Sequence, residues 1–394
     1  LFQMHHGELS LIVHQCFSYS LNKLYNKSCL FYIEMSKYYL GVMCGTSLDS
    51  IDISIVKTMG DKFKVFGFSE YVLNQKIKDV INSLKSSNPK KVKNAAFNNR
   101  FTNLIIEHIK DVMKKYHLKK NEISGIGYAG ITLCHRPDLK KSLYLGDPKM
   151  LSAVLSIPVV ADFRQTDINV GGQGAPLTGL FHKHLNQSIN RDLIYLNLGG
   201  FANITIPNGK KIISYDVGPA NYLIDGWCRE RFDIEFDLSG RLASKGEINF
   251  NVLKLMLKDK YFDKKPPKST GFELFNMNWI KQFLKKKSHI SDIDILATLT
   301  YLTVITVSND LNKYKNKPRS IFFYGGGAFN KLMVQGITDL TKLRKVKSLR
   351  YGINEKNFEA TAFSWLALMR INGVKFAKSS ITGSKKSYYL GNIY

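Results

Sequence analysis

The chain has 394 residues, of which 44% are hydrophobic and 22% are charged, so it is long enough for two domains and globular in composition. It contains no apolar run of membrane-spanning length. Its five cysteines are odd in number and lack metal spacing, so they imply neither a disulfide framework nor a zinc site, and a reducing cytoplasm fits best. The net charge of +26 comes mostly from scattered lysines without an arginine-rich arm, which favours a solvated lysine coat over a nucleic-acid-binding surface.

The first 34 residues differ in pattern from the rest of the chain. Residues 1–34 have no clear hydrophobic period, and they lack the basic start and clean apolar run of a signal peptide. Met35 then precedes a strong strand pattern. We therefore expect the natural protein to begin near Met35, with residues 1–34 as an extension.

A strand, a polar turn and a second strand open the main part of the chain. Tyr38–Met43 is apolar, and Ile51–Ile55 alternates between apolar and polar residues, which is the period of a strand. The Gly-Thr-Ser turn between them can offer backbone N–H groups and hydroxyls to phosphate oxygens. Asp49 and Asp52 could hold Mg²⁺ through waters. Such turns are common, and an ordinary hairpin turn stays open as the alternative.

The next hundred residues alternate strands and helices and end in a polar loop. Predicted strands and one long helix cover Lys64–Val72, Asn94–Tyr116 (the helix), Ile123–Tyr128, Ser142–Gly146 and Pro158–Ala161. The last strand runs into Asp162–Asp167 and a glycine-rich segment, Gly171–Leu177. Carboxylates and an arginine at a strand end beside flexible glycines indicate a loop that faces a substrate.

A second strand, glycine turn and strand unit lies at Leu193–Ile206 and repeats the layout of the first, which suggests an internal duplication. The following strand carries a single carboxylate, Asp216, before the turn at Gly218-Pro219 and a helix from Asn221. A strand end before a helix N-terminus is where α/β folds place chemistry and bind anions. The alternative is that Asp216 only caps the turn.

The C-terminal part contains a helix at Asp294–Asn312, a strand with three glycines at Ser320–Asn330, an apolar helix at Glu359–Met369 and a strand-like stretch at Tyr388–Leu390. Three glycines allow a planar group to lie against the backbone, although a tight turn would also explain them. Glu359 could simply favour the dipole of its helix.

Eight short motifs in this order resemble the anhydro-N-acetylmuramic acid kinase family, within the actin-like ATPase and sugar-kinase superfamily. The resemblance runs from about Tyr38 to the C-terminus. The motifs read LGVMCGTSLDSID, VVADFRQTD-INVGGQGAPL, LNLGGFANIT, DVGPAN, PPKSTGFELFN, GGGAFN, FEATAFSWLA and TGSKKSYYLGNIY.

The resemblance implies an α/β, two-lobed actin-like (ribonuclease H-like) sugar-kinase fold with ATP and substrate in the interlobe cleft. The lobes would cover residues 35–165 and 166–394, with a final strand that can return to the first lobe. The implied reaction uses ATP and Mg²⁺: water opens the 1,6-anhydro bond at C1 while O6 takes the γ-phosphoryl, giving N-acetylmuramic acid 6-phosphate in peptidoglycan recycling. A cytoplasmic homodimer without nucleic-acid or membrane partners is implied as well.

The resemblance also implies roles for individual residues. Asp216 matches the catalytic general base, and Glu359 matches an acid of the sugar site. Thr132, Arg164 and Asp167 fall on the substrate side, and Asp49 and Asp52 are the expected metal ligands. The expected ATP-binding residues are Gly45, Thr46, Ser47, Leu48, Asp49, Ser50, Ile51, Asp52, Gly199, Gly200, Asn203, Gly325, Gly326 and Gly327.

The chain departs from the family pattern at several positions. Ala129 and Ile131 replace a usual His and Gln, and further replacements are Gln165, Thr166, Ser50 and Ala220. We therefore expect weaker sugar binding than in a typical member.

Two other functions stay open: a kinase in which Asp216 deprotonates an open sugar hydroxyl, and a degenerate actin-like protein that binds nucleotide with little or no turnover.

Overall fold

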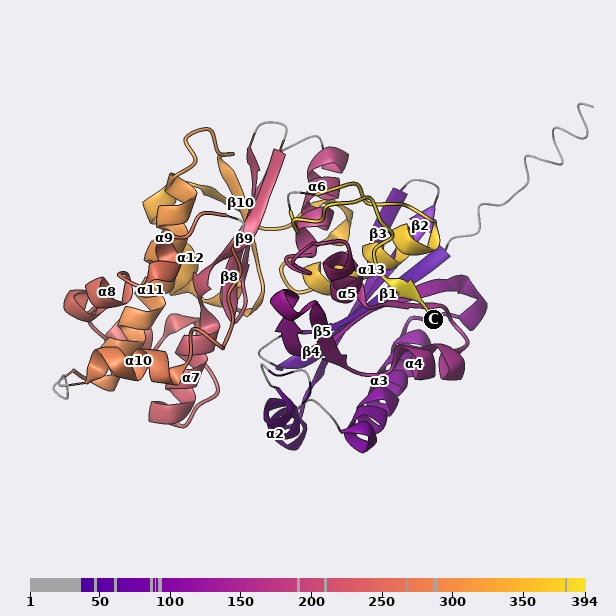
Figure 1. The fold of residues 1–394 in the computed structure, drawn as a ribbon, viewed down its shortest axis with the longest axis horizontal. Coiled ribbons are helices and arrows are strands. Elements are labelled where there is room, and N and C mark those ends of the chain that lie inside the picture. Colours follow the sequence, from indigo (N-terminus) through magenta and orange to yellow (C-terminus); the bar gives the residue numbers. More distant parts are fainter. Residues whose placement is uncertain are drawn as a thin grey trace, which may run out of the picture.

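The computed structural model describes residues 37–394, apart from 46–47, 60–61, 86–87, 89, 91–93, 190–191, 209–210, 267, 286–289 and 380. The expectation for residues 1–34 lies outside this range. Figure 1 shows two α/β lobes side by side, the first coloured mainly indigo to purple and the second magenta to orange. The two-lobed α/β fold expected from the sequence is confirmed.

The first lobe is built on a seven-stranded sheet in the order β12-β6-β4-β1-β2-β3, with β5 paired to β4. Strand β1 is antiparallel to β2 and parallel to β4, β2 is antiparallel to β3, and β4 is parallel to β6. The strands are β1 (Lys37–Cys44), β2 (Ser50–Met59), β3 (Lys62–Val72), β4 (Ile123–Arg136), β5 (Lys141–Leu145), β6 (Val159–Ala161) and β12 (Asn392–Ile393).

The second lobe is built on a five-stranded sheet in the order β11-β10-β7-β8-β9. Its pairing directions repeat those around β1 in the first sheet. On one side of β7, β8 and β9 pair in antiparallel fashion; on the other side, β10 and β11 pair in parallel fashion. The strands are β7 (Ile194–Leu198), β8 (Phe201–Asn208), β9 (Lys211–Pro219), β10 (Ser320–Tyr324) and β11 (Arg344–Val346). This repeated topology agrees with the internal duplication inferred from the two glycine-turn units.

Helices cover both faces of each sheet. They are α2 (Gln75–Leu84), α3 (Ala95–Lys115), α4 (Pro148–Leu155), α5 (Phe163–Asn169), α6 (Thr178–Ile189), α7 (Asn221–Phe232), α8 (Phe250–Met256), α9 (Lys260–Asp263), α10 (Met277–Leu284), α11 (Asp292–Asn312), α12 (Lys331–Thr341) and α13 (Phe358–Ile371). None of these described helices combines the length and the apolar character needed to cross a membrane.

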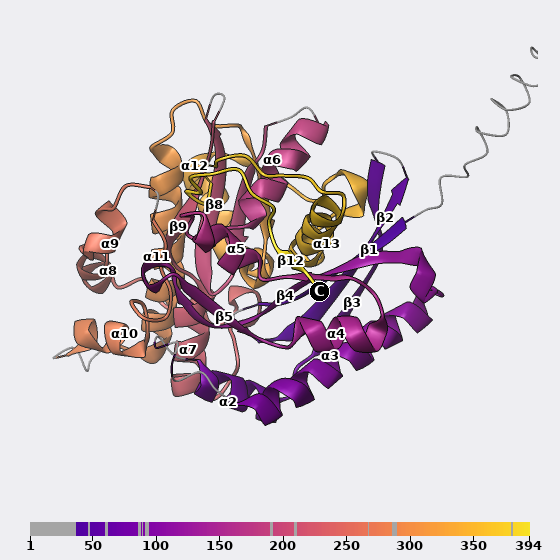
Figure 2. The ribbon, with the colours of Figure 1, turned by 45° about the vertical axis from the view of Figure 1, so that its right-hand side comes forward.

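Alternation along β1 divides the hydrophobic core. Leu40 and Val42 pack with α3 and α4 on one face, whereas Tyr39 packs with α6 and α13 on the other. Figure 2 shows α3 and α4 on the opposite side of the first sheet from α13. Tyr195 of β7 and Phe322 of β10 join the α6 and α13 core. One shared core therefore links the two sheets and places α13 between them.

Glycines bring α13 directly against the first sheet. A Cβ atom on Gly41 would lie 1.9 Å from the carbonyl oxygen of Ala360, and one on Gly127 would lie 2.1 Å from that of Phe363. Only residues without a side chain fit such contacts between a strand and a helix. The close packing fixes the first turn of α13, which carries Glu359.

Two strand predictions were wrong in extent. The strand predicted at Ile123–Tyr128 continues to Arg136, because Gly130 adopts a φ of +66° and the chain goes on to pair with β5. At the C-terminus, the paired strand is β12, antiparallel to β6, and not Tyr388–Leu390. Tyr388 pairs with Phe376 in an isolated β-bridge outside the named strands.

Candidate active site

Asp216 is held by three hydrogen bonds from α9 and the segment that follows it. Its N–H donates to the carbonyl oxygen of Lys268 at 3.1 Å, and its own carbonyl accepts from the Tyr261 hydroxyl at 2.7 Å. The N–H of Thr270 donates to Oδ2 of the carboxylate at 3.1 Å. The Thr270 contact orients the carboxylate, and no hydrogen bond joins Oδ1 to another described residue.

The environment of Asp216 shifts its proton affinity. Burial raises the pKa of Asp216 to about 6, against the lowering effect of the Thr270 N–H and of the Arg164 and Lys268 cations, while Glu273 raises it further. A carboxylate with this pKa is largely ionised at neutral pH and still basic enough to accept a proton from water.

A row of polar residues crosses the second sheet from Asp216. Asp216 of β9 pairs with Asn203 of β8, Asn203 pairs with Asn197 of β7, and Asn197 pairs with Tyr324 of β10. Paired residues share a face of the sheet. Nδ2 of Asn197 donates to Oε1 of Glu359 at 3.3 Å, so the row connects the two predicted catalytic acids.

Two acceptors in this row lack a partner. Within the described part of the chain, Oδ1 of Asn197 and Oδ1 of Asn203 are buried and accept no hydrogen bond. Leaving a buried polar atom unpaired costs about 1–3 kcal/mol, and such atoms in a native protein usually face a ligand or water. The sequence did not point to Asn197, because a single Asn inside an apolar strand is also compatible with a purely structural role.

Glu359 lies in the first turn of α13. Burial raises the pKa of Glu359 to about 7, the nearby Asp52 also raises it, and Arg164 and the Asn197 amide oppose the shift. Because Asp52 belongs to β2 and Asn197 to β7, Glu359 lies where the turns of the two sheets approach each other.

Arg164 provides the cation of the group. It lies in the first turn of α5, and its Nη1 donates to the carbonyl oxygen of Gly174 at 2.9 Å. Burial lowers the pKa of Arg164, and the charges of Asp216, Glu359 and Asp167 all oppose that shift. The Arg164 guanidinium therefore lies within electrostatic range of both predicted catalytic carboxylates.

Asp167 is fully buried, and groups of the chain use both of its oxygens. Its carboxylate accepts the Gly174 N–H at 2.7 Å, the Thr382 hydroxyl at 2.6 Å and the Tyr388 hydroxyl. The residue thus ties the Gly171–Leu177 loop to the C-terminal segment.

The other predicted sugar-side residues lie on β4. Thr132 is opposite Tyr144 of β5 and is partly buried. Ile131 is only 2% exposed and packs in the core of the first lobe, so its side chain does not line the cleft. His135, which the sequence did not single out, places Nδ1 3.2 Å from the Ser142 hydroxyl, and burial lowers its pKa to about 4.

The turn after β1 is the predicted phosphate turn of the first lobe. Thr46 and Ser47 lie outside the described residues. Leu48 adopts a left-handed φ of +63° with a buried side chain, and its N–H donates to Gly45 at 3.1 Å. Asp49 is exposed.

Asp52 lies on β2, next to Ile51, whose side chain is buried in the core of the first lobe. The Ser50 hydroxyl donates to Oδ1 of Asp52 at 2.7 Å. Burial raises the pKa of Asp52 to about 6, against this hydrogen bond.

The two glycine turns of the second lobe lie at the neighbouring ends of β7 and β10. The carbonyl oxygen of Gly200 accepts the N–H groups of Ala220 and Tyr222, both at 3.0 Å, which joins the turn to the start of α7. Gly325 has a φ of +78°, and a Cβ on Gly327 would lie 2.7 Å from the side chain of Leu198. The positive φ and the close contact explain the need for glycine at both positions.

A Cβ on Gly199 or Gly326 would meet its nearest atoms at 3.5 and 3.6 Å, which is ordinary van der Waals contact, so steric crowding does not require glycine at either position.

Asp225 of α7 is a further acid that the sequence analysis missed. Burial raises its pKa to about 7; the Arg229 cation lowers it, and Asp49 of the other lobe raises it. The sequence could have indicated Asp225 by its position four residues after Asn221, because this spacing places both side chains on one face of the predicted helix.

Comparison with known proteins gives consistent matches over most of the chain. The sequence model of the family described as anhydro-N-acetylmuramic acid kinase matches residues 37–394. The anhydro-N-acetylmuramic acid kinase of Sulfurimonas denitrificans is 35% identical over 372 residues, covering 91% of this chain and 100% of that protein. That of Pseudomonas syringae is 32% identical over 363 residues, with 91% and 100% coverage.

Similar solved structures are more distant. Component A of (R)-2-hydroxyglutaryl-CoA dehydratase from Acidaminococcus fermentans aligns with a TM-score of 0.43 at 11% identity, covering 86% of this chain and 100% of that one. A ROK hexokinase from Thermus thermophilus aligns with a TM-score of 0.36 at 10% identity, covering 85% and 99%.

Proposed function

This chain belongs to the anhydro-N-acetylmuramic acid kinase family, and we propose that it converts 1,6-anhydro-N-acetylmuramic acid with Asp216 as the general base. The chain is a kinase, and the relatives give no support to a degenerate, inactive protein. The observation that carries the assignment of the site is the row of paired polar residues that connects Asp216 to Glu359.

The proposed reaction begins with a water molecule held beside Asp216. Asp216 accepts a proton from this water as the water oxygen bonds to C1 and the C1–O6 bond breaks. The electron pair of the broken bond stays on O6, which takes the γ-phosphoryl group of ATP, and ADP leaves. The proton then passes from Asp216 to solvent. The products are N-acetylmuramic acid 6-phosphate and ADP, and no separate general acid is needed.

The nucleotide side of the site fits ATP and Mg²⁺. The backbone at Gly199 and Gly326 and the unpaired Oδ1 of Asn203 would contact phosphate, ribose or ordered water. Asp49 and Asp52 are oxygen donors of the kind that Mg²⁺ prefers, and they would hold it through water. Mg²⁺ would supply neutralisation of the phosphate charge at this place. The turn from Gly45 to Asp52 would position the triphosphate.

The sugar side is formed by α5, the loop that follows it, and α13. Arg164 and Thr132 would contact the sugar, and Glu359 would accept a hydrogen bond from it or from the attacking water. We propose a positioning role for Asp167, because its oxygens already accept hydrogen bonds from the Gly174 N–H and from C-terminal hydroxyls.

We further propose a lobe boundary near residues 165–166, with α13 and β12 contributed back to the first lobe.

The protein would work in the cytoplasm, as a homodimer, in the recycling of peptidoglycan. Such an enzyme converts a wall fragment into a phosphorylated sugar that metabolism can use.

Isotopic labelling of the product tests the reaction. In heavy-oxygen water, the product should gain one labelled oxygen at C1 at the rate of ADP release, while the phosphate ester oxygen at O6 stays unlabelled. N-acetylmuramic acid 6-phosphate incubated alone measures spontaneous exchange at C1. A kinase that phosphorylates an open hydroxyl would give label no faster than this control, and that result would refute the hydrolytic step.

A further inference from the structure

The orientation of Asp216 depends on residues outside its own sheet. β9 is the edge strand of the second sheet, so no described strand pairs with its outer side. Instead, the carbonyl oxygen of Lys268 accepts the Asp216 N–H at 3.1 Å, and the N–H of Thr270 donates to the Asp216 carboxylate at 3.1 Å. Whatever holds residues 268–270 in place therefore also holds the proposed general base.

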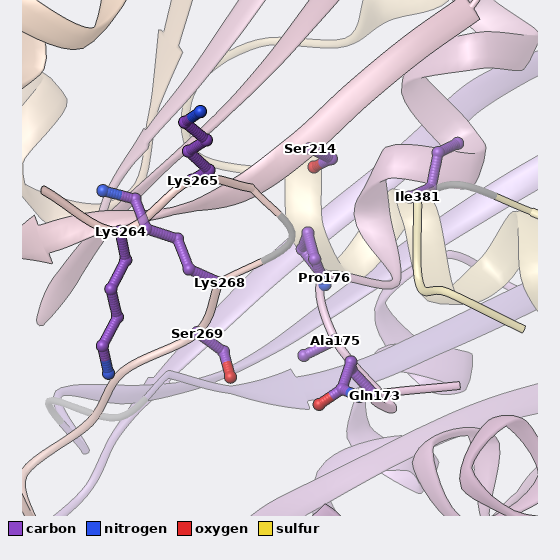
Figure 3. Close-up of a pocket in the computed structure, with 9 residues that line it drawn as sticks. All are labelled: Gln173, Ala175, Pro176, Ser214, Lys264, Lys265, Lys268, Ser269 and Ile381. Carbon is purple, nitrogen blue, oxygen red and sulfur yellow. The ribbon is translucent and has the colours of Figure 1, made fainter. Parts of the chain in front are cut away.

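The side chain of Lys268 leaves this segment toward the interior of the second lobe. Figure 3 shows it directed away from residues 173–176, which lie on the other side of the pocket. The side chain is only 3% exposed, and its Nζ lies 3.4 Å from Oδ2 of Asp310. Asp310 is a buried residue of α11. The charge of Lys268 is therefore used inside the lobe, while its backbone contacts Asp216.

Two tyrosine rings line the path of the Lys268 side chain. Its Nζ lies 4.9 Å from the ring centre of Tyr261 and 5.5 Å from that of Tyr215. Tyr215 precedes Asp216 on β9, so the two side chains lie on opposite faces of the sheet, and Tyr215 packs in the same core as α11. The Lys268 side chain thus crosses the sheet edge from the side of Asp216 to the side of α11.

Lys268 and Asp310 depend on each other unequally. Among the described residues, Asp310 is the only carboxylate within ion-pair distance of Lys268, and no other residue offers a hydrogen bond to Nζ of Lys268 or to Oδ2 of Asp310. Asp310 has a second cation, because the 58% exposed Lys313 contacts its Oδ1. A buried charge without a partner is strongly unfavourable. Without Asp310, the Lys268 side chain must therefore leave its position, whereas Asp310 without Lys268 stays paired.

Movement of residues 268–270 would change the proton affinity of Asp216. The Thr270 N–H and the Lys268 cation both lower the pKa of Asp216, against the effect of burial. The other ionisable groups that interact with Asp216 come from further elements and are Arg164 of α5, Glu273, Tyr261 of α9 and Tyr324 of β10. The arginine lowers the pKa, the glutamate raises it, and burial keeps the two tyrosines uncharged by raising their own pKa values. Displacement of the segment therefore raises the pKa of Asp216.

We propose that Lys268 and Asp310 are positioning residues for the general base: their buried ion pair anchors residues 268–270 to α11 and so holds the Thr270 N–H on the Asp216 carboxylate. The inference rests on the proposed function, because it takes Asp216 as the base. It gives a role in the reaction to Asp310, which lies outside the lining of the pocket.

Hydrogen exchange tests the anchoring in the protein without ligands. The wild type is compared with Lys268→Ala, Asp310→Asn and a control, Lys313→Ala, which also removes one cation from Asp310 but leaves the anchored segment intact. The Thr270 and Asp216 amides should exchange about tenfold faster in Lys268→Ala and Asp310→Asn than in the wild type and the control. Lys268→Ala keeps the ion pair of Asp310 with Lys313, so it provides the test even if Asp310→Asn does not fold. Exchange at the wild-type rate in Lys268→Ala would overturn the proposal.

The pH profile of kcat/KM for the sugar separates positioning from a purely structural role. Removal of the negative charge of Asp310 would by itself lower the pKa of Asp216 and move the acid limb of the profile to lower pH. Loss of the Thr270 N–H acts in the opposite direction. We expect the acid limb of Asp310→Asn to move up by about one pH unit, with kcat about tenfold lower and KM for ATP unchanged. A limb that stays in place or moves down would overturn the proposal.

The two measurements also separate this inference from the proposed function. Faster Thr270 exchange in Lys268→Ala, together with a wild-type profile that is flat between pH 5 and 8, would refute Asp216 as the titrating base and still support the anchoring. Unchanged exchange in Lys268→Ala, together with a normal acid limb in the wild type, would refute the anchoring and leave Asp216 as the base.

Discussion

Asp216 must lose its proton before it can act as a base, and the structure sets the pH at which this happens. Because burial raises its pKa to about 6, the ionised fraction increases as pH rises through 6. We therefore expect kcat/KM for the anhydro sugar to fall about tenfold per pH unit below about 6 and to level off above it. The measurement is the pH profile of ADP release at low sugar concentration. A flat profile between pH 5 and 8 would exclude Asp216 as the titrating base.

Asn203 provides a residue-scale test of the polar row. Its buried Oδ1 has no partner among the described residues, so Asn203→Ala removes no internal acceptor bond and should not lower the melting temperature. Turnover should nevertheless fall by about tenfold or more, because a positioned contact to nucleotide or water is lost.

The control is Asn186→Ala. The Asn186 side chain donates to the carbonyl oxygen of Leu193 and accepts from the Tyr195 hydroxyl within the core. This variant should lose stability and keep kcat at low temperature. An Asn203→Ala protein that unfolds as easily as Asn186→Ala, with normal kcat, would show that Asn203 is structural.

At the residue scale, the sequence identified the acidic residues that lie next to the boundary of a predicted strand or helix. Asp216 follows a strand pattern and precedes Gly218-Pro219, and Glu359 opens an apolar helix, so both stand out by position. The turn expected at Gly218-Pro219 was wrong, because β9 stays paired with β8 as far as Pro219. Asn197 and Asp225 were missed because each lies inside a regular element, where its role depends on neighbours that are remote in the chain. Asn197 acquires its role only from the approach of Glu359, 162 residues later.

At the scale of elements, the loop after α5 and the C-terminal segment form one unit through Asp167. We expect Asp167→Asn to lower the free energy of unfolding by about 2 kcal/mol, because an amide cannot accept all three of the hydrogen bonds that the carboxylate accepts. The KM for the sugar should rise, because Gly174, which binds Arg164, is held by the same carboxylate.

Urea unfolding and separate KM measurements for sugar and ATP check this prediction. The KM for ATP should not change, because its proposed turns lie on other strands. A variant with unchanged stability, or with equal losses for both substrates, would contradict a positioning role for Asp167.

Strands and helices with strong periodicity could be predicted from the sequence. Asn94–Tyr116 closely matches α3, with Asn94 as the capping residue that accepts the Phe97 N–H. The length of β4 could not be predicted, because glycine normally signals a turn, whereas Gly130 here bends a strand that continues. The approach of α13 to the first sheet depends on packing between segments more than 200 residues apart, which no local pattern records.

At the scale of the molecule, the site exists only where the two lobes meet. The first lobe contributes Asp52 and, through the returning α13, Glu359; the second contributes Asp216, Asn203 and Asn197. The repeated strand order explains this geometry, because the β1–β2 hairpin and the β7–β8 hairpin each place their turn at the corresponding end of their own sheet. The duplication was visible in the sequence, but the way in which the two copies face each other was not.

The most direct test of the account is ADP release with ATP, Mg²⁺ and 1,6-anhydro-N-acetylmuramic acid, measured for the wild type and for Asp216→Asn. The wild type should release ADP only with the sugar, and the variant should lose about a thousandfold in rate, within the range for removal of a general base. Calorimetry should show that the variant still binds both ligands. Sugar-dependent release that persists in Asp216→Asn at the wild-type rate would contradict the account.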